Sequence, residues 1–138
     1  MGKVFPRSPY ERLGGYVHLP RLIDKARLHR QGLLHGYNYK TVGFDKHLLT
    51  FLQLDPDTFE QVANELDDAG ILHWLGEHGA RHSPREQEEW NQAMIARHPE
   101  TEEKKMRFNQ LLKEAGGEGQ GDIRTYFDLI EFSEGRKK

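Results

Sequence analysis

Apolar residues recur along most of this chain at intervals of three and four positions, which is the period of an amphipathic helix. Phe59, Val62, Ala63 and Leu66 form one such stripe after Pro56. Leu, Ala and Met total 26 residues, whereas the β-branched residues Val and Ile total nine. Because unbranched side chains lose little rotamer freedom in a helix, this balance favours helices over strands. The pattern predicts an all-α protein.

Short motifs mark the places where helices are expected to begin. Ser-Pro-x-Glu occurs twice, starting at Ser8 and at Ser83, and Asp55 is followed directly by Pro56. In these motifs the Ser or Asp side chain caps the helix and Pro occupies its first turn, and in the two Ser-Pro-x-Glu motifs Glu reaches back to the capping residue. We therefore expect helices to start at all three places, and Asp45 to cap another.

The periodic segments and their stops predict a compact single-domain helical bundle of about six to eight short helices, spanning residues 1–138. The last of these segments contains aromatic residues, which leaves a strand open there as the alternative. The expected helices cover residues 9–13, 20–31, 45–52, 56–66, 67 or 68 to 79, 83–97, 101–115 (with Met106, Phe108, Leu111 and Leu112 as its apolar positions) and 122–132.

Two stretches interrupt the helical pattern. Residues 33–44 (LLHGYNYKTVGF) contain glycines and aromatic residues without a helical period, which predicts a loop or a short hairpin. The pattern does not define the conformation of residues 29–43 any further. Residues 116–121 (GGEGQG) form the one low-complexity stretch of the sequence and predict a flexible surface connector before the C-terminal segment.

Composition narrows the class of protein. The chain has 138 residues, of which 30% are charged, and a mean hydropathy of −0.85. No apolar run approaches the roughly 18 residues that a membrane-spanning helix requires. Cys is absent, which excludes disulfide frameworks, thiolate metal sites and Cys nucleophiles. The first residues lack the apolar core of a signal peptide, so we expect a cytoplasmic protein.

Charge is distributed unevenly along the chain. Residues 1–47 hold nine Lys and Arg against three acidic residues, a net charge of +6, whereas the remainder carries −8. A basic segment is typical of proteins that bind an anionic ligand, an acidic protein surface or nucleic acid. The alternative, which we favour, is that the basic and acidic parts pack against each other. Nucleic acid is disfavoured because the overall charge is negative and no helix carries a dense basic stripe.

Common catalytic and cofactor motifs are missing from the sequence. His73 and Glu77 have the i, i+4 spacing of metal ligands, but His78 lies on a different face of the expected helix and no HExxH occurs. The sequence contains neither a phosphate-binding glycine motif nor a GxSxG serine motif. We therefore expect no tightly bound metal ion and no cofactor.

The LPRLIDK segment that begins at Leu19 has the most chemical content. Its proline opens a helix, which places Arg21 in the first turn, where free backbone N–H groups attract anions. Arg21 and Lys25 share a helix face, so together they could clamp a phosphate or a carboxylate. Asp24 is three residues from both Arg21 and Arg27 and could instead pair with either of them to fasten the helix. Spacing alone favours this structural interpretation.

Three sequence blocks recur in the same order in one family: PRSPYE from Pro6, LPRLIDKAR from Leu19 and YFDLI from Tyr126. On these blocks the chain resembles, over its full length, a bacterial domain-of-unknown-function family numbered five-zero-six-nine. The resemblance implies a small bacterial protein but no activity. The positions that match the motif words of the family, and that become candidate site residues, are Arg7, Tyr10, Arg21, Asp24 and Lys25.

Two functions follow as hypotheses. The preferred one is a non-catalytic helical module that binds an anionic small molecule or an acidic protein partner through its basic N-terminal third, at the candidate site residues. The alternative is a small cofactor-independent enzyme, in which Asp24 or His18 acts as the acid or base and Arg21 orients the substrate. The sequence does not name a reaction.

Overall fold

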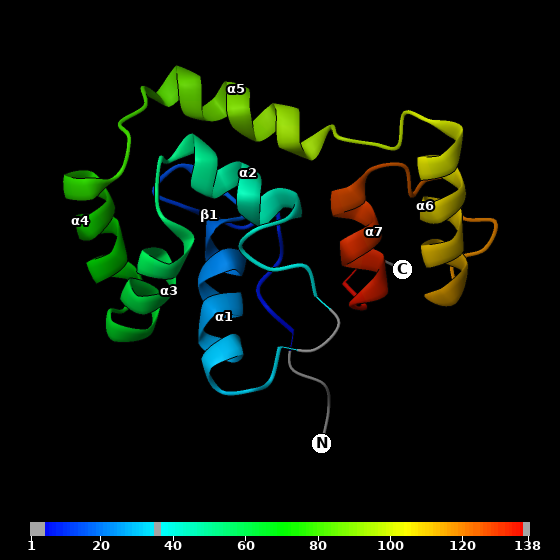
Figure 1. The fold of residues 1–138 in the computed structure, drawn as a ribbon. Helices are drawn as coiled ribbons and strands as arrows, with labels where there is room; N and C mark the ends of the chain where they lie inside the picture. The colour runs from blue at the N-terminus through cyan, green and yellow to red at the C-terminus, as the bar shows by residue number, and fades with distance from the viewer. Residues whose placement is uncertain (1–4, 35–36, 137–138) are drawn as a thin grey trace. The chain divides into compact units, whose positions relative to one another are not determined.

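The computed structural model describes residues 5–34 and 37–136. In these residues the regular structure consists of seven α-helices and one two-stranded antiparallel hairpin, which confirms the predicted helical class (Figure 1). No helix in the described ranges is both long and apolar enough to span a membrane. The elements are β1 (Arg12–Leu13), β2 (Tyr16–Val17), α1 (Leu19–Arg30), α2 (Gly43–Phe51), α3 (Pro56–Glu65), α4 (Asp68–His78), α5 (Pro84–Ile95), α6 (Glu102–Glu114) and α7 (Tyr126–Ser133).

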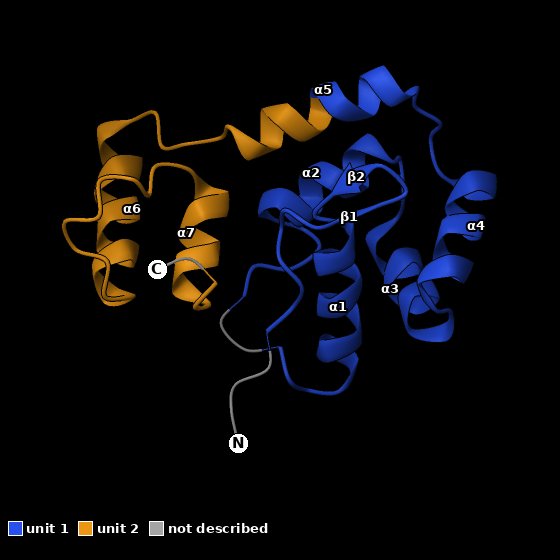
Figure 2. Ribbon diagram, turned by 180° about the vertical axis from the view of Figure 1, so that it is seen from behind, with its two compact units in different colours: residues 1–89 blue, residues 90–138 orange. Residues whose placement is uncertain are grey.

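The chain divides into two compact units at a point within α5 (Figure 2). Unit 1 comprises residues 1–89 and contains the hairpin, α1 to α4 and the start of α5. Unit 2 comprises residues 90–138 and contains the rest of α5, α6 and α7. The organisation as one domain over residues 1–138 stays a prediction, and the two units are described separately below.

Most helices begin at the capping residues that local sequence chemistry favours. At α5 the Ser-Pro-x-Glu motif forms both hydrogen bonds of a capping box. The Glu86 N–H donates to Ser83 Oγ at 3.1 Å, and the Ser83 N–H donates to Glu86 Oε1 at 2.8 Å. Each such bond satisfies a backbone group that has no partner within the helix. Side chains also cap α3 (Asp55), α4 (Asp67), α6 (Thr101) and α7 (Thr125).

The helix expected over residues 9–13 is absent, and this prediction was wrong. The capping contacts of Ser8 do form, because the Tyr10 N–H donates to Ser8 Oγ at 3.1 Å and the Ser8 N–H donates to Glu11 Oε2 at 3.2 Å. The chain then forms the β1–β2 hairpin, whose turn consists of Gly14 and Gly15 with φ angles of +61° and +88°. Positive φ at both central residues is the geometry of a tight hairpin turn, which glycine adopts without strain.

The centre of unit 1 is α1. It confirms the helix predicted over residues 20–31 and packs against α3 and β1. Eight of its 12 residues are buried, and Leu22, Ile23 and Ala26 form its apolar stripe. Polar side chains occupy much of the remaining surface of the helix, so the packing of α1 brings charged groups into the interior of the unit.

The start of α2 differs from the prediction. The helix begins at Gly43 with Val42 as its N-cap, and Asp45 lies inside the first turn. Asp45 is therefore not the capping residue. Its carboxylate is 1% exposed and accepts a hydrogen bond from the Lys40 backbone N–H at 3.1 Å. Of residues 33–44, the described part before Gly43 is a loop, which agrees with one of the two alternatives.

Unit 2 has a small apolar core of its own between α6 and α7. Phe108, Leu112, Ile123 and Leu129 are buried in it. A Cβ atom on Gly117 would lie 2.5 Å from Leu112 Cδ1, so this glycine permits a close approach that a larger residue would block. The flexibility of residues 116–121 stays a prediction.

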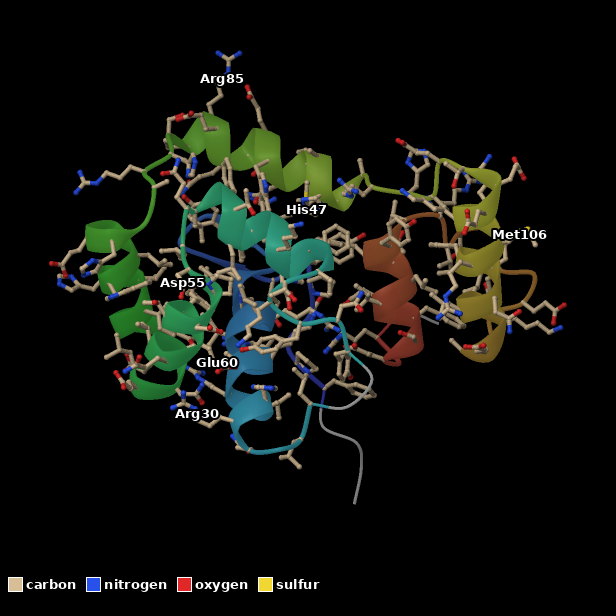
Figure 3. The ribbon with its side chains drawn as sticks, in the orientation of Figure 1. Arg30, His47, Asp55, Glu60, Arg85 and Met106 are labelled. Atoms are coloured by element: carbon tan, nitrogen blue, oxygen red, sulfur yellow. The ribbon has the colours of Figure 1, made fainter. Side chains whose placement is uncertain are left out.

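Two details of unit 2 differ from the expected helices. Met106 is 72% exposed and points outward from α6, so it does not belong to the apolar core (Figure 3). The last helix starts at Tyr126 rather than at Asp122, because Thr125 supplies the capping side chain. It is nevertheless a helix and not the strand that its aromatic residues left open.

Candidate functional site

Two polar networks lie on neighbouring faces of α1 in unit 1. The first, here named the buried cluster, consists of His18, Arg21, Lys25 and Asp45. The second, here named the groove network, consists of Arg7, Asp24, Arg27 and Asp68. Helical periodicity explains the division, because positions 18, 21 and 25 share one side of the helix and positions 24 and 27 lie beside it.

Asp45 is the centre of the buried cluster. Its Oδ1 atom lies 2.5 Å from His18 Nε2, and Lys25 Nζ lies 3.2 and 3.3 Å from its two oxygens. His18 is the N-cap residue of α1 and has a φ angle of +70°, a left-handed conformation that turns its ring toward α2. His18 and Asp45 are each 1% exposed and Lys25 is 6% exposed, so water contributes little to their solvation.

Arg21 is the second cation of the buried cluster and is 2% exposed. Its Nη1 group donates to the backbone carbonyl of Arg7 at 3.2 Å. The guanidinium also lies 5.6 Å from the centre of the Tyr37 ring, within the range of a cation–π contact. A planar donor group held in this way is suited to an anion with two oxygens, such as a carboxylate or a phosphate.

Protonation states in the buried cluster follow from its burial and charges. Burial lowers the pKa of His18, and the Lys25 and Arg21 charges lower it further, against the opposing effect of Asp45. Burial alone would raise the pKa of Asp45, but the contacts with His18 and Lys25 outweigh it and the pKa is lowered. The lowered pKa of His18 favours a neutral imidazole beside the Asp45 carboxylate at neutral pH. In that state Nε2–H donates to Asp45, and the lone pair of the ring lies on Nδ1.

Residues 37–42, here named the cover segment, contact three members of the buried cluster. The Tyr37 ring faces Arg21, the Asn38 carbonyl accepts from Lys25 Nζ at 2.9 Å, and the Lys40 N–H donates to Asp45. The side chains of this segment are half-buried or exposed. The cover segment thus lies between the cluster and solvent along this side of α1.

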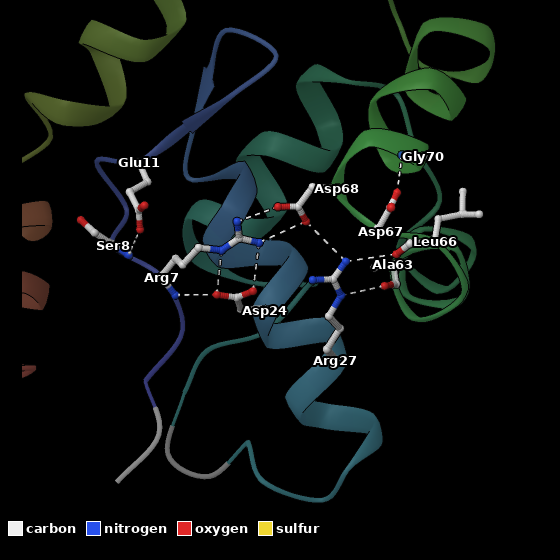
Figure 4. A network of polar contacts seen from close by, with 10 residues as sticks. All are labelled: Arg7, Ser8, Glu11, Asp24, Arg27, Ala63, Leu66, Asp67, Asp68 and Gly70. Atoms are coloured by element: carbon white, nitrogen blue, oxygen red, sulfur yellow. Dashed lines mark hydrogen bonds and ion pairs between the residues drawn. The ribbon is translucent and has the colours of Figure 1, made fainter. Parts of the chain in front are cut away.

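The groove network connects three parts of unit 1, namely the N-terminal segment, α1 and α4 (Figure 4). Asp24 accepts three hydrogen bonds from Arg7, from the backbone N–H at 2.8 Å and from Nε and Nη2 at 3.0 Å. Arg7 Nη1 also donates to Asp68 at 2.8 Å. The Asp68 carboxylate is shared with Arg27 Nη2 at 3.4 Å, so it lies between two guanidinium groups.

Arg27 completes the groove network on the α3 side. Its side chain donates to the carbonyls of Ala63 and Leu66 at 3.0 and 3.1 Å, where α3 ends. The groove itself has a volume of about 440 Å³ and is lined by Arg7, Asp24, Arg27, Asp67, Asp68 and Ala69. Carboxylates raise the pKa of Arg7 and Arg7 lowers the pKa of Asp68, as expected for mutual ion pairs. An added anion would have to displace a carboxylate here.

The structure separates the candidate site residues into different places. Arg21 and Lys25 lie together in the buried cluster, and Arg7 and Asp24 lie together in the groove network. Tyr10 is half-buried in the turn after Ser8. The ligand-binding role of each residue stays a prediction.

Sequence reasoning assigned Asp45 to helix capping and did not single out Tyr37 or Asn38. A signal for Asp45 existed, because it is one of three acidic residues among the first 47, and so a natural partner for the surrounding cations. Tyr37 and Asn38 gave no comparable signal, since their roles depend on how the loop folds. Asp24, the second of the three acidic residues, accepts hydrogen bonds from the backbone and side chain of Arg7 in the groove network.

Ion pairs within unit 1 support the interpretation that the basic and acidic parts of the chain pack together. Cations from residues 1–47 meet carboxylates from the acidic remainder at several places. These pairs are Arg7–Asp68, Arg12–Glu88, Arg27–Asp68 and Lys40–Asp57. As to metals, the described ranges contain no group of three or more His, Cys, Asp or Glu side chains that could hold an ion.

Comparison with known proteins identifies a family but no activity. The curated proteins include no match to this chain. A family model, described as "Domain of unknown function (DUF5069)", matches residues 3–136, which is nearly the whole chain. The match confirms the resemblance stated from the sequence, and the chain belongs to the family of this domain of unknown function.

Proposed function

We propose that this protein binds a small anionic molecule at the buried cluster, with Arg21 and Lys25 as the groups that hold it. The observation that carries the proposal is the burial of two cations, 2% and 6% exposed, on one face of α1 beside the buried His18. Away from water the attraction between opposite charges is several times stronger than at a solvated surface. An anion enclosed here would gain more than one bound to exposed lysines.

Energetics also favour a ligand role over a purely structural one. Taking a charged side chain out of water costs several kcal/mol, and a buried ion pair often stabilises a fold no better than apolar residues of similar volume. Four ionisable side chains share this one place. Concentrations of perturbed ionisable groups are more frequent at functional sites than elsewhere in proteins.

Burial also selects between the two partner classes that the sequence allowed. An acidic protein surface reaches only side chains that are open to solvent, whereas Arg21 and Lys25 are enclosed. The burial of both cations therefore favours a small molecule, which the cover segment would have to admit, over a protein partner. We therefore take the ligand to be a small carboxylate or phosphate compound.

Thermal unfolding in the presence of anions tests this proposal. Inorganic phosphate, acetate and citrate at millimolar concentrations are the probes, because a ligand that binds the native state raises the melting temperature. We expect at least one of them to raise it, and Arg21→Gln to abolish the increase. Arg30→Gln is the matched control, since Arg30 is an exposed arginine on the same helix (Figure 3). The proposal fails if no anion has an effect, or if both variants lose it equally.

A second candidate function is acid–base catalysis by His18, favoured by its 2.5 Å contact with Asp45. A carboxylate that orients a neutral imidazole, with two cations near to stabilise a developing anion, is the arrangement of a general base. Asp24 is less suited to this role, because its carboxylate already accepts three N–H groups from Arg7. His18 is therefore the better of the two bases considered from the sequence.

Hydrogen–deuterium exchange tests the catalytic candidate without knowledge of the reaction. A general base removes a proton from carbon next to a carbonyl, and in D₂O a deuteron replaces it. Small 2-oxo acids are the probes, followed by proton NMR. If His18 is a base, the native protein accelerates exchange and His18→Asn does not, while Asn is compatible with the left-handed backbone at this position. Equal exchange with and without protein would exclude this activity for the tested acids.

A further inference from the structure

We propose that residues 37–42, the cover segment, form the entrance through which a small anion reaches the buried cluster, and that the Glu60 carboxylate holds this entrance closed. The inference rests on the proposed function, since it concerns access to the same site. It assigns to Glu60, a residue of α3 that the sequence analysis did not single out, a role in regulating that access (Figure 3).

The inner side of the cover segment is held by the buried cluster itself. Lys25 Nζ donates to the Asn38 carbonyl at 2.9 Å, and the Lys40 N–H donates to Asp45 Oδ2 at 3.1 Å. The first bond uses Lys25, which a bound anion would also engage, and the second holds the segment on the Asp45 carboxylate beside it. The segment must therefore move, at least at Asn38, before a ligand can contact Lys25.

The outer side of the cover segment is held by two carboxylates of α3, Glu60 and Asp57. Glu60 Oε1 accepts from the Tyr39 hydroxyl at 2.7 Å, lies 2.8 Å from His29 Nδ1 and lies 3.6 Å from Lys40 Nζ. The neighbouring Asp57 accepts from Lys40 Nζ at 2.7 Å. Two consecutive residues of the segment are thus tied to α3 by side chains alone, and Glu60 is the group they have in common.

Backbone geometry favours movement of the segment once these side-chain contacts break. Lys40 has a φ angle of +38°, an unfavourable conformation for a residue with a side chain, and it persists because its surroundings hold it. The Thr41 N–H donates to the Tyr39 carbonyl at 2.5 Å, which closes a tight turn rather than a helix or sheet. Gly43, with a φ angle of +64°, joins the segment to α2 and supplies a pivot.

Amide exchange of the unliganded protein, followed by NMR, tests the role of Glu60 directly. Glu60→Gln removes the charge but keeps the shape of the acceptor, and we expect the Lys40 amide to exchange about tenfold faster, because charged hydrogen bonds are the stronger ones. Glu65→Gln, an exposed change on the same helix, is the matched control and should leave Lys40 exchange unaltered. Unaltered exchange in Glu60→Gln would overturn the inference.

Tyr39→Phe provides a second variant that leaves α3 unchanged. It removes only the hydroxyl that donates to Glu60, and we expect a smaller acceleration at Lys40, of a few fold. The amide of Ala63, in the buried part of α3, reports whether a change is local. Acceleration at Lys40 alone supports the inference, whereas equal acceleration at Ala63 and Lys40 in Tyr39→Phe would overturn it.

Binding kinetics with inorganic phosphate separate this inference from the proposed function. If the segment is the entrance, Glu60→Gln opens it more often in both the free and the bound protein, so association and dissociation each become about tenfold faster while the dissociation constant stays the same. If phosphate binds with unchanged rates, the inference that the cover segment is the entrance is overturned, but the proposed function is left intact. If the protein binds none of phosphate, acetate and citrate, the proposed function fails, and the exchange experiments still decide whether Glu60 holds the segment.

Discussion

The two networks on α1 use the same kinds of side chain in different ways. In the groove network, Arg7 and Arg27 contact carboxylates and carbonyls from other segments, and their side chains remain about a third exposed, at 31% and 32%. In the buried cluster, His18 and Lys25 converge on Asp45, and water is nearly excluded.

The difference shows that spacing along a helix does not decide the role of a charged residue. Asp24 and Lys25 are adjacent in the sequence, yet one clamps the N-terminal segment and the other lies in the candidate site. The face on which each residue lies, and the depth of that face, separate a partly solvated ion pair from an enclosed one.

Asp45→Asn should give the largest effect, because it breaks the buried cluster at its centre. Loss of the carboxylate leaves the Lys25 ammonium enclosed beside a neutral amide, and removal of one partner of a buried pair costs about 3–5 kcal/mol. The free energy of unfolding, measured by urea denaturation at pH 7, should fall by that amount. A decrease below about 1 kcal/mol would mean that the cluster is far better solvated than its burial indicates.

Asp24→Asn makes the corresponding change in the groove network, and a smaller decrease is expected. Three hydrogen bonds from Arg7 are weakened, but the side chains of Arg7 and Asp24 are partly solvated. We therefore expect the free energy of unfolding to fall by about 1–2 kcal/mol. The loss should shrink further in 1 M NaCl, because salt screens charges near the surface. The comparison is contradicted if Asp24→Asn costs as much as Asp45→Asn, or if salt changes both equally.

Acidic pH should act through the buried cluster and lower the free energy of unfolding by a still smaller amount. The pKa of His18 is lowered by burial, so between that value and the ordinary value of about 6.5 the unfolded chain takes up a proton that the native ring does not. Stability is therefore full above the ordinary pKa and falls as pH decreases toward the native pKa. Urea denaturation from pH 7 to pH 5 should show a shallower decline in His18→Asn than in the native protein, while Asp24→Asn keeps the native slope.

Arg12→Gln should give the smallest change in the free energy of unfolding. Arg12 and Glu88 form an ion pair whose side chains are 44% and 46% exposed, and exposed pairs contribute little. The free energy of unfolding should change by no more than about 0.5 kcal/mol. A larger loss would show that position 12 stabilises the hairpin by means other than its charge.

Local chemistry allowed several parts of the fold to be predicted. Ser83, Asp55 and Thr101 cap helices because a side chain and a backbone N–H three residues on are all that a cap requires. Ser8 has the same motif, but its Oγ accepts from the N–H of Tyr10, two residues on, and no helix follows. There the Gly-Gly turn follows after too few residues for a helix to become stable.

Tertiary contacts limited what could be predicted of the candidate site. Asp45 resembles a capping residue in its local sequence, but its partners His18 and Lys25 lie 27 and 20 residues away. The Arg21–Lys25 pair was predictable from helical spacing, whereas the assignment of Asp24 to Arg7 required the path of the N-terminal segment. The residues of α1 were thus identified in advance, whereas Tyr37, Asn38 and Asp45, which contact them, were not.

Residue 7 takes part in both networks at once. Its guanidinium grips two carboxylates in the groove, while its peptide carbonyl receives the Arg21 side chain on the other face of α1. An anion that reorients Arg21 would therefore alter how firmly the N-terminal segment around Arg7 is held. By thermodynamic reciprocity, loosening that segment would change the affinity of the buried cluster for the anion by an equal factor.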